Sequence, residues 1–158
     1  TSNQTFKIME LLFEEKQKFN QWWLWVMLLV FPLLSIIPFD GDGINYNYVL
    51  IGIAIPLMFY FFELRTFVTK EGLHYQFFPF HFKKYLIRLD EIEKIEALQY
   101  KPLGDYGGWG IRYGFKGKAY NVSGNKGVKF YLTNGRNILF GSQKYKDLEK
   151  VLKRIKKQ

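Results

Sequence analysis

Residues 22–39 read WWLWVMLLVFPLLSIIPF, a run of eighteen positions without a charged side chain. As an α-helix that rises about 1.5 Å per residue, this run would be about 27 Å long, close to the hydrocarbon thickness of roughly 30 Å. Residues 44–62 form a second uncharged run of similar length, and the FDGDG between the two runs favours an exposed turn. The sequence therefore predicts a two-helix transmembrane hairpin over residues 22–64.

Two alternatives to this hairpin are disfavoured by the residues: a pair of buried helices in a soluble core, and a cleaved signal peptide. Pro32 and Pro56 would interrupt the backbone hydrogen bonds of two buried helices in water, whereas proline is tolerated in a membrane span. A chain of 158 residues could hardly cover two helices that are apolar on every side. A cleaved signal peptide is disfavoured because mostly polar residues precede the first run and no small-residue cleavage site follows it.

Lysine and arginine residues predict the orientation of the hairpin. The turn at 39–47 contains neither residue type, three lysines precede the first run, and a long basic tail begins at Arg65. By the positive-inside rule, both termini should be cytoplasmic and the protein should be multi-pass. Ahead of the first run, apolar residues recur at roughly helical spacing, which predicts an amphipathic juxtamembrane helix over residues 1–21. An ordinary solvated extension is the alternative for this segment.

From residue 66 onward the apolar pattern alternates, which is typical of strands. The strongest local signal is GVKFYLTNGRNILFG at 127–141, in which Asn134-Gly135 predicts a two-residue type I′ hairpin. The other predicted strands lie on either side of residues 70–72 and at 84–89, 93–100, 111–115 and 119–122.

The end of the chain returns to a helical period. Leu148, Val151, Leu152 and Ile155 fall at i, i+3, i+4 and i+7 after Ser142, a candidate N-cap, and lysines occupy the opposite face. This pattern predicts a helix that packs its apolar stripe on a sheet. Residues 66–158 contain 19 Lys and Arg against 8 Asp and Glu, so most of the net charge of +9 lies in this half.

Three stretches are most recognisable: YGGWGIR at 106–112, GKAYNVSGNKGVKF at 117–130 and NGRNILFGSQK at 134–144. Together with seven or so antiparallel strands followed by one helix, they resemble a bacterial family of small membrane proteins with two transmembrane helices and a pleckstrin-homology-like (PH-like) domain. The resemblance implies an α+β membrane protein whose hairpin precedes a PH-like antiparallel β-barrel, capped by a C-terminal helix. It also implies a cytoplasmic domain over residues 65–158 and a location in the bacterial cytoplasmic (inner) membrane. It implies no general activity.

No catalytic or cofactor site is predicted. The absence of cysteine excludes disulfides, thiolate nucleophiles and cysteine-ligated metals. The glycines of residues 104–127 miss both phosphate-loop patterns, because Arg112 and Tyr113 occupy positions that require glycine. His74 and His81 lack convincing further metal ligands nearby. We therefore expect a protein that is not an enzyme, with no cofactor, no metal and no evident small-molecule substrate; nucleic acid is disfavoured because no recognition motif is present.

Exposed aromatic residues are the predicted contacts with a protein partner. Phe77, Phe78, Phe80 and Phe82 form the densest apolar cluster of the second half, and alternate members of a strand cannot all face one interior. Burial of all four between the barrel and the helix is the alternative. Trp109 is flanked by glycines that leave its ring little cover. The candidate partner contacts are Phe78, Phe80, Phe82 and Trp109.

Basic residues directly after the phenylalanine cluster and near the glycine-rich stretch are the predicted contacts with lipid headgroups. Each basic residue near an anionic surface contributes about 1 kcal/mol of attraction without needing a pocket. The candidate headgroup contacts are Lys83, Lys84, Arg112, Lys116 and Lys118.

These features predict a membrane-anchored interaction or accessory module without catalysis. Its expected partner is another membrane protein or complex, or a second copy of the chain. The alternative is a domain that senses anionic lipid at the cytoplasmic face of the membrane.

Overall fold

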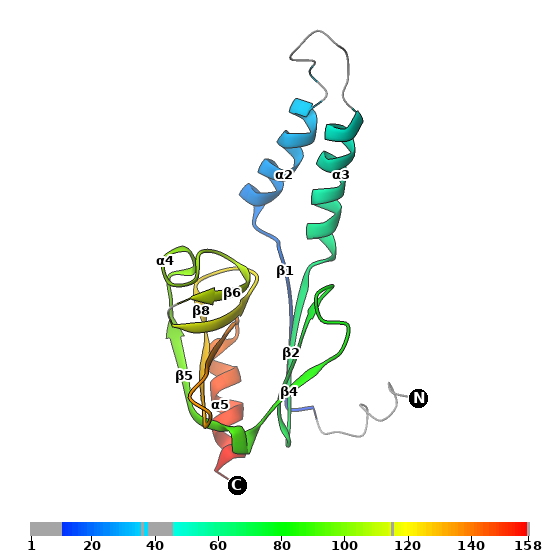
Figure 1. Cartoon of the computed structure of the whole chain (residues 1–158). Coiled ribbons are helices and arrows are strands. Elements are labelled where there is room, and N and C mark those ends of the chain that lie inside the picture. Colours follow the sequence, from blue (N-terminus) through cyan, green and yellow to red (C-terminus); the bar gives the residue numbers. More distant parts are fainter. Residues whose placement is uncertain (1–10, 36, 38–45, 115, 158) are drawn as a thin grey trace, which may run out of the picture. The chain divides into compact units, whose positions relative to one another are not determined.

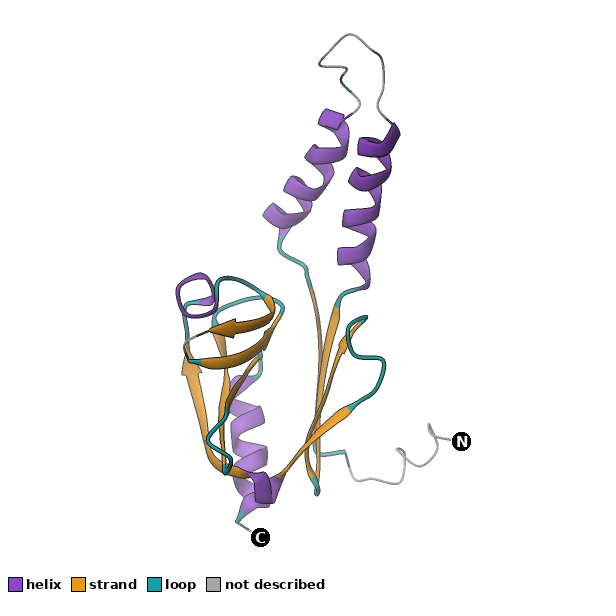
Figure 2. Ribbon diagram, in the orientation of Figure 1, coloured by secondary structure: helices purple, strands orange, loops and turns teal. Residues whose placement is uncertain are grey.

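The computed structural model describes residues 11–35, 37, 46–114 and 116–157 (Figures 1 and 2). The chain divides into two compact units. One is Lys18–Phe62, and the other holds the described residues of Thr1–Gln17 and Glu63–Gln158. The helices and strands together make an α+β protein.

The first unit is a helical hairpin of α2, Trp22–Ser35, and α3, Tyr46–Phe61. The two helices approach closely at Gly52, where an added Cβ would lie 2.8 Å from the Cα of Pro32. A larger residue at this position would force the helices apart. Glycine is therefore required here for the packing of α2 against α3.

Neither helix of the hairpin is long enough to cross a bilayer. With 14 and 16 residues, α2 and α3 fall short of the roughly 20 residues that a span requires. Across the described residues, the structure has no helix with both the length and the apolarity needed to cross a membrane. This finding overturns the predicted transmembrane hairpin over 22–64, and with it the multi-pass location in the inner membrane with cytoplasmic termini.

The segment before the hairpin is a strand and not the predicted amphipathic helix. β1, Phe13–Lys18, belongs to the first sheet, and the N–H of Leu12 just before it donates to the Val68 carbonyl at 2.9 Å. Its inward residues are polar: Glu15 and Gln17 are buried, while Glu14, Lys16 and Lys18, which alternate with them, are exposed. The remainder of the predicted helix, residues 1–10, lies outside the described residues.

Buried hydrogen bonds explain why polar residues of β1 face inward. The Glu15 carboxylate accepts from the Ser142 hydroxyl at 2.5 Å and from the Gln143 N–H at 2.9 Å. The Gln17 side-chain amide donates to the Gly141 carbonyl at 2.7 Å. These bonds tie β1 to the start of the C-terminal segment.

The strands of the described residues form two separate sheets and do not close into a barrel. In the four-stranded sheet, β1 is followed in order by β2 (Glu63–Thr69), β3 (Gly72–Phe78) and β4 (Tyr85–Arg88). The five-stranded sheet has the order β5 (Ile92–Gln99), β8 (Lys126–Leu132), β9 (Asn137–Gly141), β7 (Gly117–Asn121) and β6 (Gly110–Gly114).

Two features replace the predicted antiparallel barrel. The short helix η1, Leu89–Glu91, separates β4 from β5, which lie at the edges of different sheets. In addition, β7 and β9 pair in parallel, because the chain reverses direction twice between them. The helix α4, Pro102–Tyr106, lies in the connection between β5 and β6. The predicted strand positions are nevertheless confirmed.

The last hairpin is confirmed, but its turn type was predicted wrongly. No described residue other than glycine has a positive φ, so Asn134 cannot take its position in a type I′ turn. Instead, the Leu132 N–H donates to the Arg136 carbonyl at 2.9 Å, which closes a three-residue loop. Gly135 takes the left-handed conformation in this loop, with a φ of 79°.

The unit that contains both sheets has its core between the sheets and under α5, Tyr145–Lys156. The Tyr75 ring of the first sheet lies 4.9 Å from the rings of both Tyr120 and Phe140 of the second. On α5, Leu148 and Leu152 are completely buried. The predicted C-terminal helix and its apolar face are thus confirmed.

Candidate functional site

The last residue of β3 and the β3–β4 loop that follows it carry three of the four predicted aromatic contacts. Phe77 is fully buried at the end of β3, whereas Phe78, Phe80 and Phe82 are 39%, 59% and 82% exposed. The alternative in which all four rings are buried is therefore wrong. Phe78 and Phe82 pair edge to face, with ring centroids 6.4 Å apart. We call Phe78, Phe80 and Phe82 the aromatic loop.

Hydrogen bonds hold the aromatic loop in place. The Gln76 side-chain amide donates to the carbonyls of His81 and Phe82, at 3.0 and 3.3 Å. The His81 N–H donates to the Phe77 carbonyl at 2.8 Å, and the Phe77 N–H donates to Nδ1 of His81 at 3.3 Å. The rings are thus presented on an ordered backbone, which lowers the entropy cost of binding.

Trp109 lies in the connection between α4 and β6, just before a strand of the five-stranded sheet, whereas the aromatic loop connects strands of the four-stranded sheet. Its indole N–H donates to the Gly124 carbonyl at 3.0 Å, and its own carbonyl accepts from Nε of Arg112 at 2.9 Å. The side chain is half-buried. Trp109 is therefore partly covered, which the flanking glycines did not indicate.

The predicted basic contacts fall into different environments. Lys83 is exposed, and the ammonium of Lys84 lies 5.2 Å from the centre of the Phe67 ring. Lys116 pairs with Asp105 at 2.9 Å, and this hydrogen bond lowers the pKa of the Asp105 carboxyl. Lys118 is half-buried on β7. A single headgroup surface formed by all five basic residues is not evident from these contacts.

The two histidines occupy aromatic environments. His74 stacks on Phe67 with ring centroids 4.7 Å apart, and its Nε2 lies 3.0 Å from the Thr69 hydroxyl oxygen. Burial lowers the pKa of His74, and so does Lys84, against the opposing effect of Glu71. In the described part of the chain, no three metal-ligating side chains come together.

His81 belongs to a cluster that the sequence analysis missed. Its ring contacts those of Tyr85 and Tyr120, with centroids 4.7 and 5.6 Å away. Burial lowers the pKa of His81, and the nearby charge of Lys118 lowers it further. His81 and Lys118 are 37 positions apart in the sequence, and their proximity depends on how the two sheets pack. No local motif could have found it.

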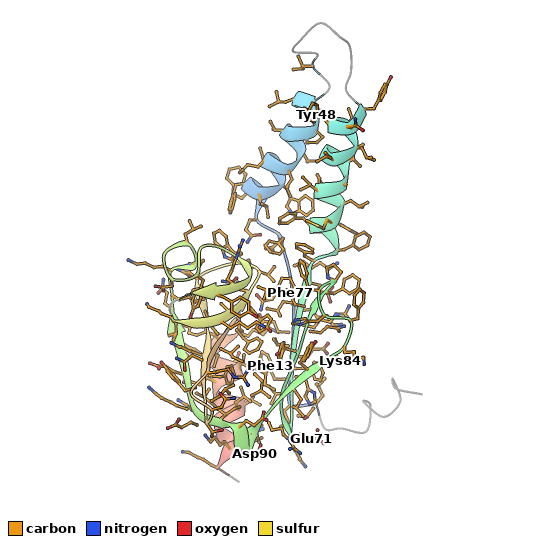
Figure 3. All side chains as sticks on the ribbon, viewed as in Figure 1. Phe13, Tyr48, Glu71, Phe77, Lys84 and Asp90 are labelled. Carbon is orange, nitrogen blue, oxygen red and sulfur yellow. The ribbon has the colours of Figure 1, made fainter. Side chains whose placement is uncertain are left out.

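The hairpin carries the other candidate surface. Neither α2 nor α3 contains Asp, Glu, Lys, Arg or His, and side chains project from both helices in several directions (Figure 3). Trp22 and Leu50, for example, are 77% and 67% exposed. The hairpin surface is formed by the exposed apolar side chains Trp22, Trp23, Val26, Met27, Leu29, Val30, Leu33, Leu34, Tyr46, Tyr48, Leu50, Ile51, Ile53, Leu57, Met58, Tyr60 and Phe61.

No protein-family model matches this chain, and the search of curated proteins finds no match either. The resemblance to the PH-like membrane family therefore stays a prediction.

Proposed function

We propose that the protein is a non-catalytic interaction module that docks on a protein partner. The observation that carries this proposal is the hairpin surface. Monomeric proteins rarely expose contiguous apolar patches larger than a few hundred Å². Complete burial of one large apolar side chain contributes about 1.5–3 kcal/mol, so covering this surface offers a strong driving force for association.

The chemistry of the hairpin surface indicates what kind of partner fits it. Because α2 and α3 carry no charged side chain, a charge on the partner's contact face would be buried without a counter-charge. The partner should therefore present apolar helices. A second copy would cover one side of the hairpin and leave the other exposed, so we favour a different protein whose helices cover both sides.

The aromatic loop supplies a second contact in this proposal. Interfaces draw most of their binding energy from a few well-packed residues, and aromatic side chains are prominent among them. Phe80 and Phe82 are both exposed and lie on a hydrogen-bonded backbone. They could therefore be buried by a partner with little reorganisation of the loop.

Native co-purification tests the proposal. Leu29→Glu together with Leu50→Glu places two charges on the hairpin surface, at positions that are 55% and 67% exposed. A stoichiometric partner should be lost from this variant and kept by the control Lys150→Glu, which changes an exposed residue of α5. Retention of the partner at wild-type stoichiometry would contradict docking through the hairpin.

The alternative function, binding of anionic lipid, is favoured by the basic residues beside the aromatic loop. It makes a different prediction: replacing Lys83, Lys84, Lys116 and Lys118 by Gln should abolish binding to anionic vesicles, and salt should weaken binding by the wild type. Docking on a protein predicts instead that Phe80→Ala with Trp109→Ala releases the partner. Loss of lipid binding in the lysine variant, with the partner kept by the aromatic variant, would favour lipid over protein docking.

A further inference from the structure

One face of β7 places a lysine against two tyrosine rings. Lys118 and Tyr120 lie two residues apart on this strand and so share a face, while Tyr113 of β6 pairs directly with Lys118. The ammonium of Lys118 lies 4.7 Å from the centre of the Tyr120 ring and 5.0 Å from that of Tyr113. The lysine is thus fixed by its neighbours on two strands.

A histidine from the other sheet approaches the same tyrosine. The His81 ring lies 5.6 Å from that of Tyr120 and 4.7 Å from that of Tyr85 on β4. Because Nδ1 of His81 accepts the Phe77 N–H, the proton of the neutral ring is assigned to Nε2. Nε2 is therefore a hydrogen-bond donor on the side of the ring away from its own backbone contact.

This donor pair has no acidic partner among the described residues. No described carboxylate lies within 4 Å of the Lys118 ammonium, whereas Lys116, two positions earlier, is paired with Asp105. Contacts with aromatic rings compensate a partly buried ammonium by only about 0.5–2 kcal/mol. The ammonium of Lys118 therefore lies near a histidine and has no carboxylate partner among the described residues.

The site is open to solutes. His81 and Lys118 are half-buried, while the neighbouring Tyr85 and Tyr113 are 48% and 76% exposed. An anion could therefore approach both side chains from solution, at a site that is partly shielded from water. Hydrogen bonds to charged groups are about twice as strong as neutral ones.

We propose that His81 and Lys118, framed by Tyr85, Tyr113 and Tyr120, bind a phosphate group. A phosphate offers several acceptor oxygens, enough for the Lys118 ammonium and Nε2–H of His81 together. Inorganic phosphate and the phosphomonoester of a lipid headgroup share this chemistry. The site is independent of the docking proposed for the hairpin, and a phosphomonoester lipid would give the lipid-binding alternative a defined contact.

The test uses the full chain with isotope-labelled histidine, followed by NMR. Inorganic phosphate is titrated against chloride of equal ionic strength, and vesicles containing phosphatidic acid are compared with pure phosphatidylcholine vesicles. Saturable shifts of the His81 signals with inorganic phosphate support the site and identify a free anion. Saturable shifts with phosphatidic acid vesicles alone support it and identify a lipid headgroup.

Lys118→Met should weaken the binding that is observed at least tenfold, and Lys118→Arg should restore most of it because the charge is kept. Lys116→Met is the matched control, since that lysine is already paired with Asp105, and it should bind as the wild type does. Far-UV circular dichroism checks that each variant is folded. Shifts that never saturate with either probe, or that are equal in wild type and Lys118→Met, would overturn the proposal.

Discussion

The hairpin and the two-sheet unit are both rich in large apolar side chains, but they place them differently. In the two-sheet unit, Phe77, Phe130 and Phe140 are completely buried, because strands direct alternate residues to one side. In the hairpin, residues such as Leu33 and Leu50 are about two-thirds exposed, at 65% and 67%. Stability should therefore reside in the sheets, and association in the hairpin.

The largest expected effect on stability comes from making the same substitution, leucine to aspartate, in each region. Leu152→Asp on α5 buries a charge at a completely buried site and should destabilise the two-sheet unit by several kcal/mol. Leu50→Asp in the hairpin should leave the stability of that unit unchanged. Urea unfolding, followed by the tyrosine signals of the two-sheet unit, measures both, and equal losses would show that the regions do not differ in this way.

A second prediction concerns the polar contacts that fix β1. Glu15→Ala removes the acceptor of the Ser142 hydroxyl and the Gln143 N–H, so the expected loss is about 1–3 kcal/mol in the free energy of unfolding. Glu14→Ala changes an exposed neighbour on the same strand and should cost little. If the two variants unfold at the same urea concentration, β1 is not held by these bonds.

The third prediction is a dependence of stability on pH. Burial lowers the pKa of both His74 and His81 in the folded protein, so the unfolded chain binds more protons once the pH falls below about 6.5. Stability is therefore full above that pH and declines as the pH falls toward the lowered values. Urea midpoints between pH 7.5 and 5.5 should show this decline, and His74→Gln with His81→Gln should flatten it.

The smallest expected effect is a change in the pKa of His81 when the charge of Lys118 is removed. Lys118 lowers the pKa of His81, next to Tyr85 of β4 and Tyr120 of β7. Lys118→Met removes this charge and should raise that pKa, while burial still keeps it below the ordinary value. An NMR titration of the His81 ring measures the change, and an unchanged pKa would mean that the two side chains are too far apart to interact.

Local sequence patterns predicted the elements well and their assembly poorly. The strands around residues 70–72 and the helix carrying Leu148 and Leu152 were found because their periodicity is local. β1 was missed because its buried residues, Glu15 and Gln17, are polar, so hydrophobic periodicity could not indicate a strand. The division into two sheets depends on pairing between distant strands, for which the sequence carries no local signal.

Helix length and the packing of the two sheets account for the remaining differences between prediction and structure. The eighteen-residue apolar run at 22–39 was read as one helix, but α2 ends at Ser35 and is too short to span. The exposure of Phe80 and Phe82 was predicted from strand alternation, but both residues lie in the loop between β3 and β4. The approach of Lys118 to His81 was not predicted, because it arises only when the two sheets pack together.

Site-specific photo-crosslinking is the most direct measurement of the central claim. A photoreactive amino acid at Leu50, on the hairpin surface, is compared with one at Lys150, on the exposed face of α5. Docking of the hairpin predicts one discrete adduct with a different protein from position 50 and none from position 150. Adducts of lipid mass alone, an adduct of two copies of this chain, or no adduct at position 50 would contradict it.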